Sequence, residues 1–121
     1  MIIAVTSMGA DLADDVSSRF GRAPYFLLLD SESADLLEAI ENPNVSAGGG
    51  AGVQSSQILA DKGVQAVLTG NCGPKAFQVF AAAGIDICTG ASGSVLDALR
   101  DYKAGELQSA AAANVGSHHG A

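Results

Sequence analysis

The first half of the chain places apolar runs between short polar breaks, a pattern that predicts three strands. Ile2–Ser7 forms the first run, and Pro24–Asp30 is almost continuously apolar, as is typical of a strand buried on both faces. Leu36–Glu41 mixes charged with apolar residues, so we expect a strand with an exposed edge. Because only a tight polar turn at residues 31–33 joins the last two runs, these strands must pair antiparallel.

After residue 45 the pattern changes to helical spacing that alternates with short apolar runs. The predicted helices are Gly52–Lys62, a stretch from Pro74 to Gly84, and a third that starts at Ser92 or Ser94. The predicted strands between them are Val64–Thr69 and Ile85–Cys88. Gly63 and Gly84 stand where helices commonly end in a left-handed residue. Ser94 with Asp97 resembles a capping box. Strands that alternate with helices indicate parallel pairing through right-handed crossovers.

These elements predict one α/β domain with the order β-β-β-α-β-α-β-α. The antiparallel and parallel strands share a mixed five-stranded sheet, which is the arrangement of a ribonuclease-H-like three-layer domain. A chain of 121 residues is long enough for one such domain with a real core. We assign residues 1–107 to the domain and residues 108–121 to a flexible tail. His118 and His119 in the tail could bind a metal, but an unstructured end or a cloning remnant is the preferred interpretation.

Composition and charge exclude several classes of partner. The content of 48% apolar and 16% charged residues is typical of an ordinary soluble domain. No apolar run approaches the roughly 18 residues of a membrane span, and the start of the chain lacks the basic stretch of a signal peptide. We therefore expect a cytoplasmic protein without a membrane partner. The net charge of −7 also argues against a nucleic-acid surface.

Three glycine-rich turns each open a predicted helix, and the last two directly follow a strand. The turns are Ser46–Gly52, Thr69–Lys75 and Thr89–Ser94. In an α/β sheet such turns lie at the carboxyl ends of strands, where ligands bind, and their bare N–H groups favour an anion. Glycines that merely permit tight turns are the alternative, which we prefer for Gly63 and Gly84.

The basic residues are unevenly placed. Arg19, Arg22 and Lys75 lie in or beside glycine-containing loops, whereas the other three cations fall late in predicted helices, where they suit the helix dipole. We expect the first three to form a local positive pocket. As an alternative, Arg22 could pair with an acid such as Asp14 or Asp15.

The two cysteines are too few for a disulfide framework and differ in context. Cys88 lies in an apolar run and is expected to be a small buried side chain. Cys72 lies next to a predicted helix N-terminus, where the helix dipole lowers the pKa of a thiol. The thiolate is a soft donor suited to copper or iron–sulfur species, so Cys72 is the candidate metal ligand.

Four ordered motifs carry a family resemblance that covers about residues 1–107. The motifs are Ser18–Phe26, Gly48–Gln54, Thr69–Phe77 and Ala83–Ile85. Together they resemble the dinitrogenase iron–molybdenum cofactor biosynthesis family, whose members are similar to the ribonuclease-H-like fold. The resemblance implies a non-enzymatic carrier of an anionic metal–sulfur cluster that contains molybdenum, copper or iron, with cluster-assembly or acceptor proteins as possible partners.

One residue departs from the family pattern. Nitrogenase cofactor carriers often have a histidine before Phe-Gly in the first motif, and that histidine is implicated in cofactor binding. Arg19 stands at this position before Phe20. The departure argues for electrostatic holding of an anionic cluster rather than direct ligation, since cations and N–H dipoles can hold such a cluster without covalent ligands.

The candidate cofactor-binding residues follow from these motifs. They are Arg19, Phe20, Arg22, Gly48, Gly49, Gly50, Gly52, Asn71, Cys72, Gly73 and Lys75. For Phe20 we prefer a place in the core over a contact with the ligand. A regulatory module that binds a nucleotide or phosphate through the same loops remains the alternative function.

Enzymatic functions find little support in the residues. A ribonuclease-H-type nuclease needs converging carboxylates that begin in the first strand, and Ile2–Ser7 contains no acid. A Cys–His nucleophile is unsupported because both histidines lie in the tail. The glycine-rich turns also lack the pattern of a P-loop or a dinucleotide-binding fingerprint. We therefore expect a binding protein without catalytic residues.

Overall fold

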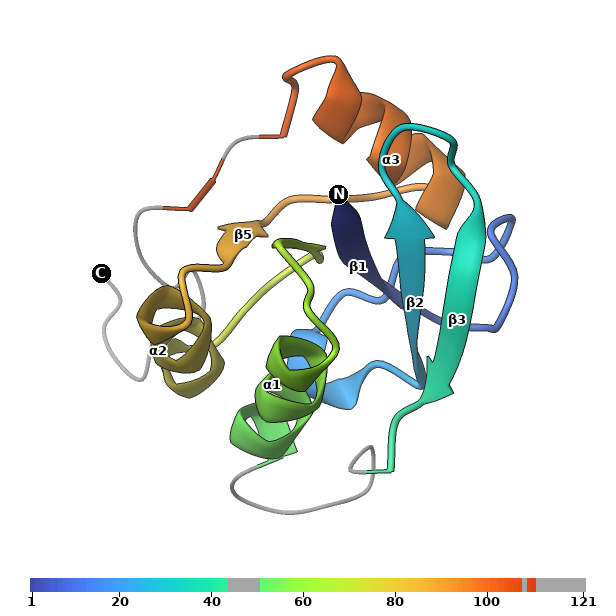
Figure 1. Cartoon of the computed structure of the whole chain (residues 1–121). Coiled ribbons are helices and arrows are strands. Elements are labelled where there is room, and N and C mark those ends of the chain that lie inside the picture. Colours follow the sequence, from blue (N-terminus) through green and yellow to red (C-terminus); the bar gives the residue numbers. More distant parts are fainter. Residues whose placement is uncertain (44–50, 108, 111–121) are drawn as a thin grey trace.

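The computed structural model describes residues 1–43, 51–107 and 109–110 (Figure 1). Its elements in chain order are β1 (Ile2–Ser7), the 3₁₀ turn η1 (Phe20–Arg22), β2 (Tyr25–Asp30), β3 (Leu36–Glu41), α1 (Ala51–Asp61), β4 (Ala66–Leu68), α2 (Pro74–Ala82), β5 (Asp86–Cys88) and α3 (Val95–Lys103). The predicted α/β class is confirmed. The predicted strands and helices differ from the structure at their ends: β4 is shorter than the predicted Val64–Thr69, and β5 starts one residue late. The η1 turn was not predicted.

The strands form one mixed five-stranded sheet in the order β3-β2-β1-β4-β5. β2 pairs antiparallel with β1 and β3, whereas β4 pairs parallel with β1 and β5. In the centre of the sheet Val5 lies opposite both Leu27 and Leu68. The predicted edge strand β3 is at the edge, with Leu36 and Leu37 exposed.

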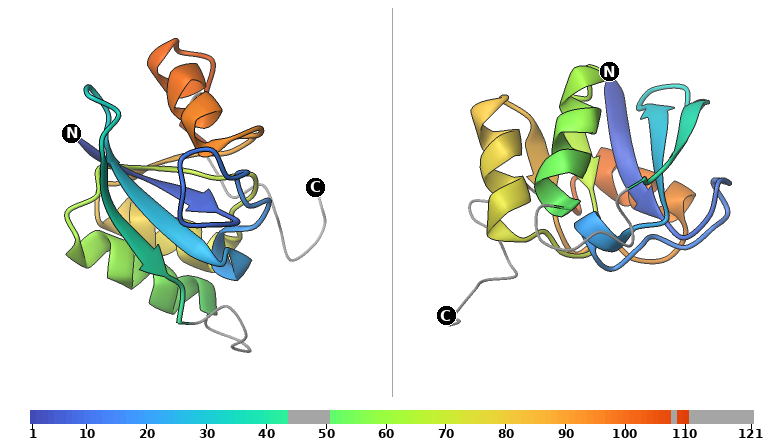
Figure 2. Two further views of the ribbon diagram at one scale, coloured as in Figure 1. Left: turned by 90° about the vertical axis from the view of Figure 1, so that its right-hand side faces the viewer. Right: turned by 90° about the horizontal axis from the view of Figure 1, so that it is seen from below.

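The helices cover both faces of the sheet and enclose two apolar cores. α1 and α2 lie on one face, and α3 lies on the other (Figure 2). Successive residues of a strand point to opposite faces, so Phe26 packs with Leu59 and Phe80, whereas Leu27 packs with Leu99. Because β1, β4 and β5 run parallel, their carboxyl ends lie at the same edge of the sheet.

The predicted helix ends are confirmed. Gly63 and Gly84 adopt φ values of +78° and +74° just after α1 and α2, a conformation that side chains other than glycine rarely adopt. Ser94 is the N-cap of α3: its hydroxyl accepts a hydrogen bond from the Asp97 N–H at 3.0 Å, and the Asp97 carboxylate accepts from the Ser94 N–H at 3.1 Å. The third helix therefore starts after Ser94 and not after Ser92.

Two residues of the predicted tail lie against the sheet. Ser109 forms an antiparallel bridge with Cys88, and the Ala110 N–H donates to the Ile87 carbonyl at 2.6 Å. Residues 108 and 111–121, which include His118 and His119, lie outside the described residues. No helix in the described ranges is long and apolar enough to cross a membrane.

Candidate functional site

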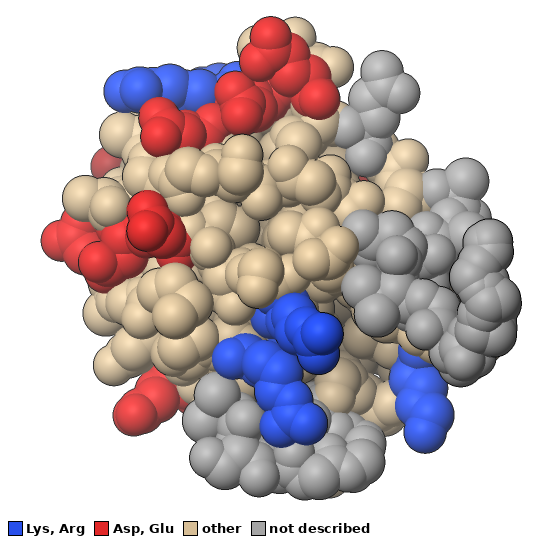
Figure 3. Space-filling model, turned by 180° about the vertical axis from the view of Figure 1, so that it is seen from behind, with Lys and Arg blue, Asp and Glu red and all other residues tan. Residues whose placement is uncertain are grey.

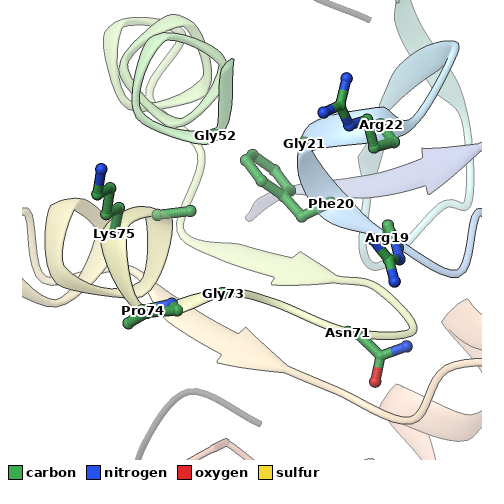
Figure 4. Close-up of a pocket in the computed structure, with 10 residues that line it drawn as sticks. Arg19, Phe20, Gly21, Arg22, Gly52, Asn71, Gly73, Pro74 and Lys75 are labelled. Atoms are coloured by element: carbon green, nitrogen blue, oxygen red, sulfur yellow. The ribbon is translucent and has the colours of Figure 1, made fainter. Parts of the chain in front are cut away.

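A pocket of about 330 Å³ opens between η1, the start of α1 and the start of α2. The residues that line it are Arg19, Phe20, Gly21, Arg22, Gly52, Asn71, Gly73, Pro74, Lys75 and Ala76 (Figure 4). The β4–α2 turn brings Asn71 and Gly73 to the pocket from the end of a parallel strand. The pocket thus lies at the carboxyl edge of the sheet, which is where ligands bind in open α/β folds.

Three exposed cations surround this pocket. Arg19 directly precedes η1, Arg22 is the last residue of η1, and Lys75 lies across the pocket from them on α2 (Figure 4). Within the described residues, Arg19 and Lys75 form no ion pair with an acid. Lys62 and Arg100 instead pair with Glu38 at 3.1 Å and Asp97 at 3.5 Å, respectively, away from the pocket.

The charged side chains are unevenly distributed over the surface. On the face seen in Figure 3, one group of Lys and Arg side chains lies at the upper left beside acidic side chains, and the others lie on the lower part, where few acidic side chains are visible. The chain carries 13 acidic and 6 basic residues, so a local excess of positive charge stands out against an acidic background. Such a pocket attracts anions.

The start of α2 adds backbone donors to these cations. Gly73 is the N-cap and supplies no side-chain cap, Pro74 occupies the first turn, and the first turn holds no acidic residue. A helix N-terminus in this state carries a partial positive charge and N–H groups without helical partners. Because Lys75 and Ala76 line the pocket, this end of the helix faces the space where a ligand would sit.

Asn71 joins the two loops that carry the cations. Its side-chain Nδ2 donates to the Ser18 carbonyl at 2.8 Å, and its own carbonyl accepts from the Phe20 N–H at 3.0 Å. Gly70 approaches the same loop so closely that an added Cβ would lie 2.8 Å from Ser18 Cα and the Ser18 carbonyl oxygen. The loop before η1 and the β4–α2 turn are therefore fastened together, which fixes Arg19 relative to α2.

Phe20 forms the apolar floor of the pocket. Only 2% of its surface is exposed, and its ring stacks on Phe26 at 5.3 Å between centroids and meets the edge of Phe80 at 5.1 Å. The preference for a core position is thus confirmed. The same side chain nevertheless lines the pocket, because the core reaches the surface between η1 and α2 (Figure 4).

The prediction of a thiolate at Cys72 is wrong. The residue stands just before the N-cap of α2, but its side chain is 1% exposed and belongs to the core between the sheet and α1–α2. Its thiol donates to the Gly73 carbonyl at 3.6 Å. Burial raises the pKa of Cys72 to about 11, because desolvation of the charged form outweighs the helix dipole. Cys72 does not line the pocket; Cys88 is buried as expected.

The structure brings most of the predicted site residues together. Those at the pocket are Arg19, Phe20, Arg22, Gly52, Asn71, Gly73 and Lys75. Gly48, Gly49 and Gly50 lie outside the described residues. Gly21, Pro74 and Ala76 also line the pocket but were not predicted as site residues from the sequence. Each lies inside one of the family motifs, which is the signal that could have identified it. Among the described residues, no group of three or more His, Cys, Asp or Glu could hold a metal ion.

The third glycine-rich turn lines a different hollow. Gly90 and Gly93 border a space of about 540 Å³ with Asp15 and Ser18, and Asn71 separates this space from the cationic pocket because it lines both. The described glycine turns therefore share an edge of the sheet but do not converge on one pocket.

The fold and the pocket define a small three-layer α/β domain with a positively charged ligand-type pocket at the carboxyl edge of its sheet. A sequence profile of the family described as Dinitrogenase iron-molybdenum cofactor matches residues 1–105, and the chain belongs to this family.

Solved structures and one curated relative agree with this assignment. The apo form of the orange protein from Desulfovibrio gigas has a TM-score of 0.89 and 36% identity, covering 94% of this chain and 96% of that one. A putative NifB protein from Thermotoga has a TM-score of 0.78 and 35% identity, covering 89% and 91%. An uncharacterised protein of Methanocaldococcus jannaschii is 32% identical over 95 residues, which are 77% of this chain and 80% of the relative. The family and the orange protein point to a cofactor-binding or carrier role.

Proposed function

We propose that the chain is a carrier that binds an anionic metal–sulfur cluster in the pocket between η1 and α2. The observation that carries the proposal is that Arg19, Arg22 and Lys75 line one pocket together with the N-terminus of α2, in a chain of net charge −7. Cations and helix N-H groups stabilise a multiply charged anion without forming a covalent bond to it.

The lining of the pocket favours a large, weakly hydrated anion. Its floor is the Phe20 ring, with Pro74 and Ala76 beside it, and the cations stand at the rim. A small oxyanion on an apolar floor would lose water without finding enough donors, which is costly. A sulfide-covered cluster spreads its charge over more surface and tolerates apolar contact. Because the description of the family names an iron–molybdenum cofactor, we propose molybdenum as one metal, with copper or iron as further metals.

We propose holding by charge and backbone donors rather than by a protein thiolate. Cys72 is neutral at ordinary pH, since its pKa is raised to about 11, and it is buried in the core and does not line the pocket. We further propose that the protein has no catalytic activity of its own and passes the cluster to acceptor or assembly proteins in the cytoplasm. We also propose that its fold is of the ribonuclease-H-like type.

The proposal is tested by titrating the protein with tetrathiomolybdate, with and without Cu(I), under anaerobic conditions and following binding by calorimetry and visible absorbance. We expect saturable binding. Arg19→Ala and Lys75→Ala should each weaken binding about tenfold, as is typical for the loss of one charge-assisted contact.

Lys62→Ala is the matched control. It removes the same charge from the molecule, but Lys62 pairs with Glu38 just beyond the far end of α1 and does not line the pocket. Its affinity should equal that of the wild type. The absence of saturable binding would contradict the proposal, and binding of a nucleotide or phosphate in place of thiomolybdate would favour a regulatory module.

A further inference from the structure

We propose that Asn42 is a positioning residue for the cluster site, because it holds the η1 turn in the conformation that directs Arg22 to the pocket. This role rests on the proposed function, since it concerns affinity for the anion. Asn42 does not line the pocket, and the role proposed for it is exerted through the turn that it binds.

The η1 turn has little support of its own. It comprises only Phe20–Arg22, its N-cap Arg19 makes no side-chain cap, and one backbone bond of 3.3 Å joins the Ala23 N–H to the Phe20 carbonyl. A single 3₁₀ turn with poor hydrogen-bond geometry is weakly stable in isolation. Anchors from other elements must therefore set where its arginines lie.

Asn42 is such an anchor at the Arg22 end of the turn. Its Nδ2 donates to the Ala23 carbonyl at 2.8 Å and to the Gly21 carbonyl at 3.4 Å, the two residues on either side of Arg22. The Asn42 N–H also donates to the Pro24 carbonyl at 2.9 Å. With 2% of its surface exposed, Asn42 makes these bonds out of contact with water, where they are directional and costly to leave unmade.

A second contact connects this anchor to α1. The hydroxyl of Ser55, a fully buried residue of α1, donates to Asn42 Oδ1 at 3.2 Å. The amide of Asn42 is therefore oriented from one side by a helix and binds the turn from the other. It links the end of β3, the η1 turn and α1 in one hydrogen-bonded unit.

The opposite end of the turn is held separately. Asn71 binds the Ser18 carbonyl and the Phe20 N–H, so it fixes Arg19. Because Asn71 lines the pocket itself, a substitution there would mix positioning with direct contact. Asn42 does not line the pocket, so its substitution removes no side chain from the pocket wall.

The expected consequence is a loss of preorganisation. An arginine that is fixed before the anion arrives loses little conformational freedom on binding, whereas a mobile one must be ordered at that moment. Asn42→Ala should therefore weaken tetrathiomolybdate binding about tenfold, and Ser55→Ala, which only loosens the amide of Asn42, about threefold.

A double-mutant cycle separates positioning from a general loss of stability. Affinity for tetrathiomolybdate is measured for the wild type, Asn42→Ala, Arg22→Ala and the double variant, well below the melting temperature of each. If Asn42 acts through Arg22, its substitution should change affinity less than about twofold once Arg22 is absent. Val95→Ala is the stability control, because Val95 is a fully buried residue of α3, which lies on the other face of the sheet.

The outcomes are distinct. Loss of affinity in Asn42→Ala and Ser55→Ala, dependent on Arg22 and absent in Val95→Ala, supports the role. An equal loss in the presence and absence of Arg22, or unchanged affinity in a folded Asn42→Ala protein, overturns it while leaving the proposed function intact. If Asn42→Ala does not fold, the same cycle with Ser55→Ala decides. If the wild type itself does not bind tetrathiomolybdate, the proposed function fails and this role fails with it.

Discussion

The thiol of Cys72 stands just before the start of α2, and 1% of its surface is exposed. A helix N-terminus favours a thiolate only when the sulfur lies among the N–H groups and near water. Here the side chain points into the core with Phe20 and Phe80, where the charged form would lose its hydration. The prediction was wrong because it rested on the position of Cys72 along the chain. The direction of the side chain decides whether the helix dipole lowers the pKa of the thiol or burial raises it.

The raised pKa of Cys72 predicts that stability falls in alkaline solution. The folded thiol has a pKa of about 11 against an ordinary value of 9.0, and Cys88 behaves in the same way. The folded state therefore retains protons that the unfolded state releases, so this contribution to stability is complete below about pH 9 and is lost as the pH rises towards 11. Urea unfolding at increasing pH measures this loss.

The matched control for this dependence is a protein in which both cysteines are alanine, which should lose much less stability over the same pH range. The ultraviolet absorbance of the thiolate provides a direct check, since the native thiols should titrate well above those of the urea-unfolded chain. A native Cys72 that ionises at or below the unfolded value would contradict this account.

At the scale of elements, the site is built where two connections cross. The loop that follows β1 meets the β4–α2 turn, and Gly70 allows their backbones to touch. The Gly70 N–H donates to the Ser17 carbonyl at 3.3 Å, and the hydroxyl of Thr6 donates to the same carbonyl at 3.1 Å. Hydrogen bonds thus connect the segments that follow β1 and β4 beyond the paired strands, and these bonds position Arg19.

Gly70→Ala should disrupt this crossing. The new Cβ would lie 2.8 Å from backbone atoms of Ser18, which cannot move aside as a flexible side chain would. We expect a loss of about 1–3 kcal/mol in unfolding free energy, together with weaker tetrathiomolybdate binding, because Arg19 is displaced. Chemical denaturation and calorimetric titration measure the two effects.

Gly52→Ala is the control within the same pocket. Its Cβ would meet Ala76 Cβ at 3.6 Å, an ordinary contact, and the position lies inside α1. Replacing a helical glycine by alanine should leave stability unchanged or raise it by up to about 1 kcal/mol. Equal destabilisation by both substitutions would contradict the special role of Gly70.

The elements themselves could be predicted from the sequence because each has a local signal. Apolar runs indicated the strands. Gly63, Gly84 and Ser94 indicated the helix ends, because a positive φ favours glycine and a capping box favours serine at the N-cap. The anchor at Asn42 had no such signal. Its contacts to Ala23 and Ser55 depend on how β3 returns beside η1, which only the folded chain determines.

The candidate site was predictable to a similar extent. Motifs around Arg19 and Lys75 indicated which loops matter, and the carboxyl-edge rule indicated that these loops meet. The rule does not say which loops line the same pocket. The turn with Gly90 and Gly93 lines a separate space on the other side of Asn71. The burial of Cys72 was likewise beyond reach, because it depends on packing under α2 rather than on spacing.

At the scale of the whole molecule, the protein is acidic but presents a cationic pocket. Net charge of the chain repels an anion at long range, whereas Arg19, Arg22 and Lys75 attract it at short range. Salt screens exposed charges, with a Debye length that falls from about 10 Å at 0.1 M to about 3 Å at 1 M. Salt therefore weakens both the long-range repulsion by the net charge and the short-range attraction by the cations. Once the anion is in the pocket, the attraction by the exposed rim cations should be the larger of the two.

Binding of tetrathiomolybdate should consequently weaken as salt is added. Between about 0.1 M and about 1 M sodium chloride we expect a loss of affinity of about tenfold, because the rim cations are exposed and lose much of their attraction. Calorimetric titration across this range gives the slope. The Arg19→Ala, Lys75→Ala double variant should show a flatter slope, and Lys62→Ala should match the wild type, because its charge lies away from the pocket. Wild-type affinity that is independent of salt would mean that the cluster is held by apolar contact or a sulfur ligand, and would contradict holding by charge.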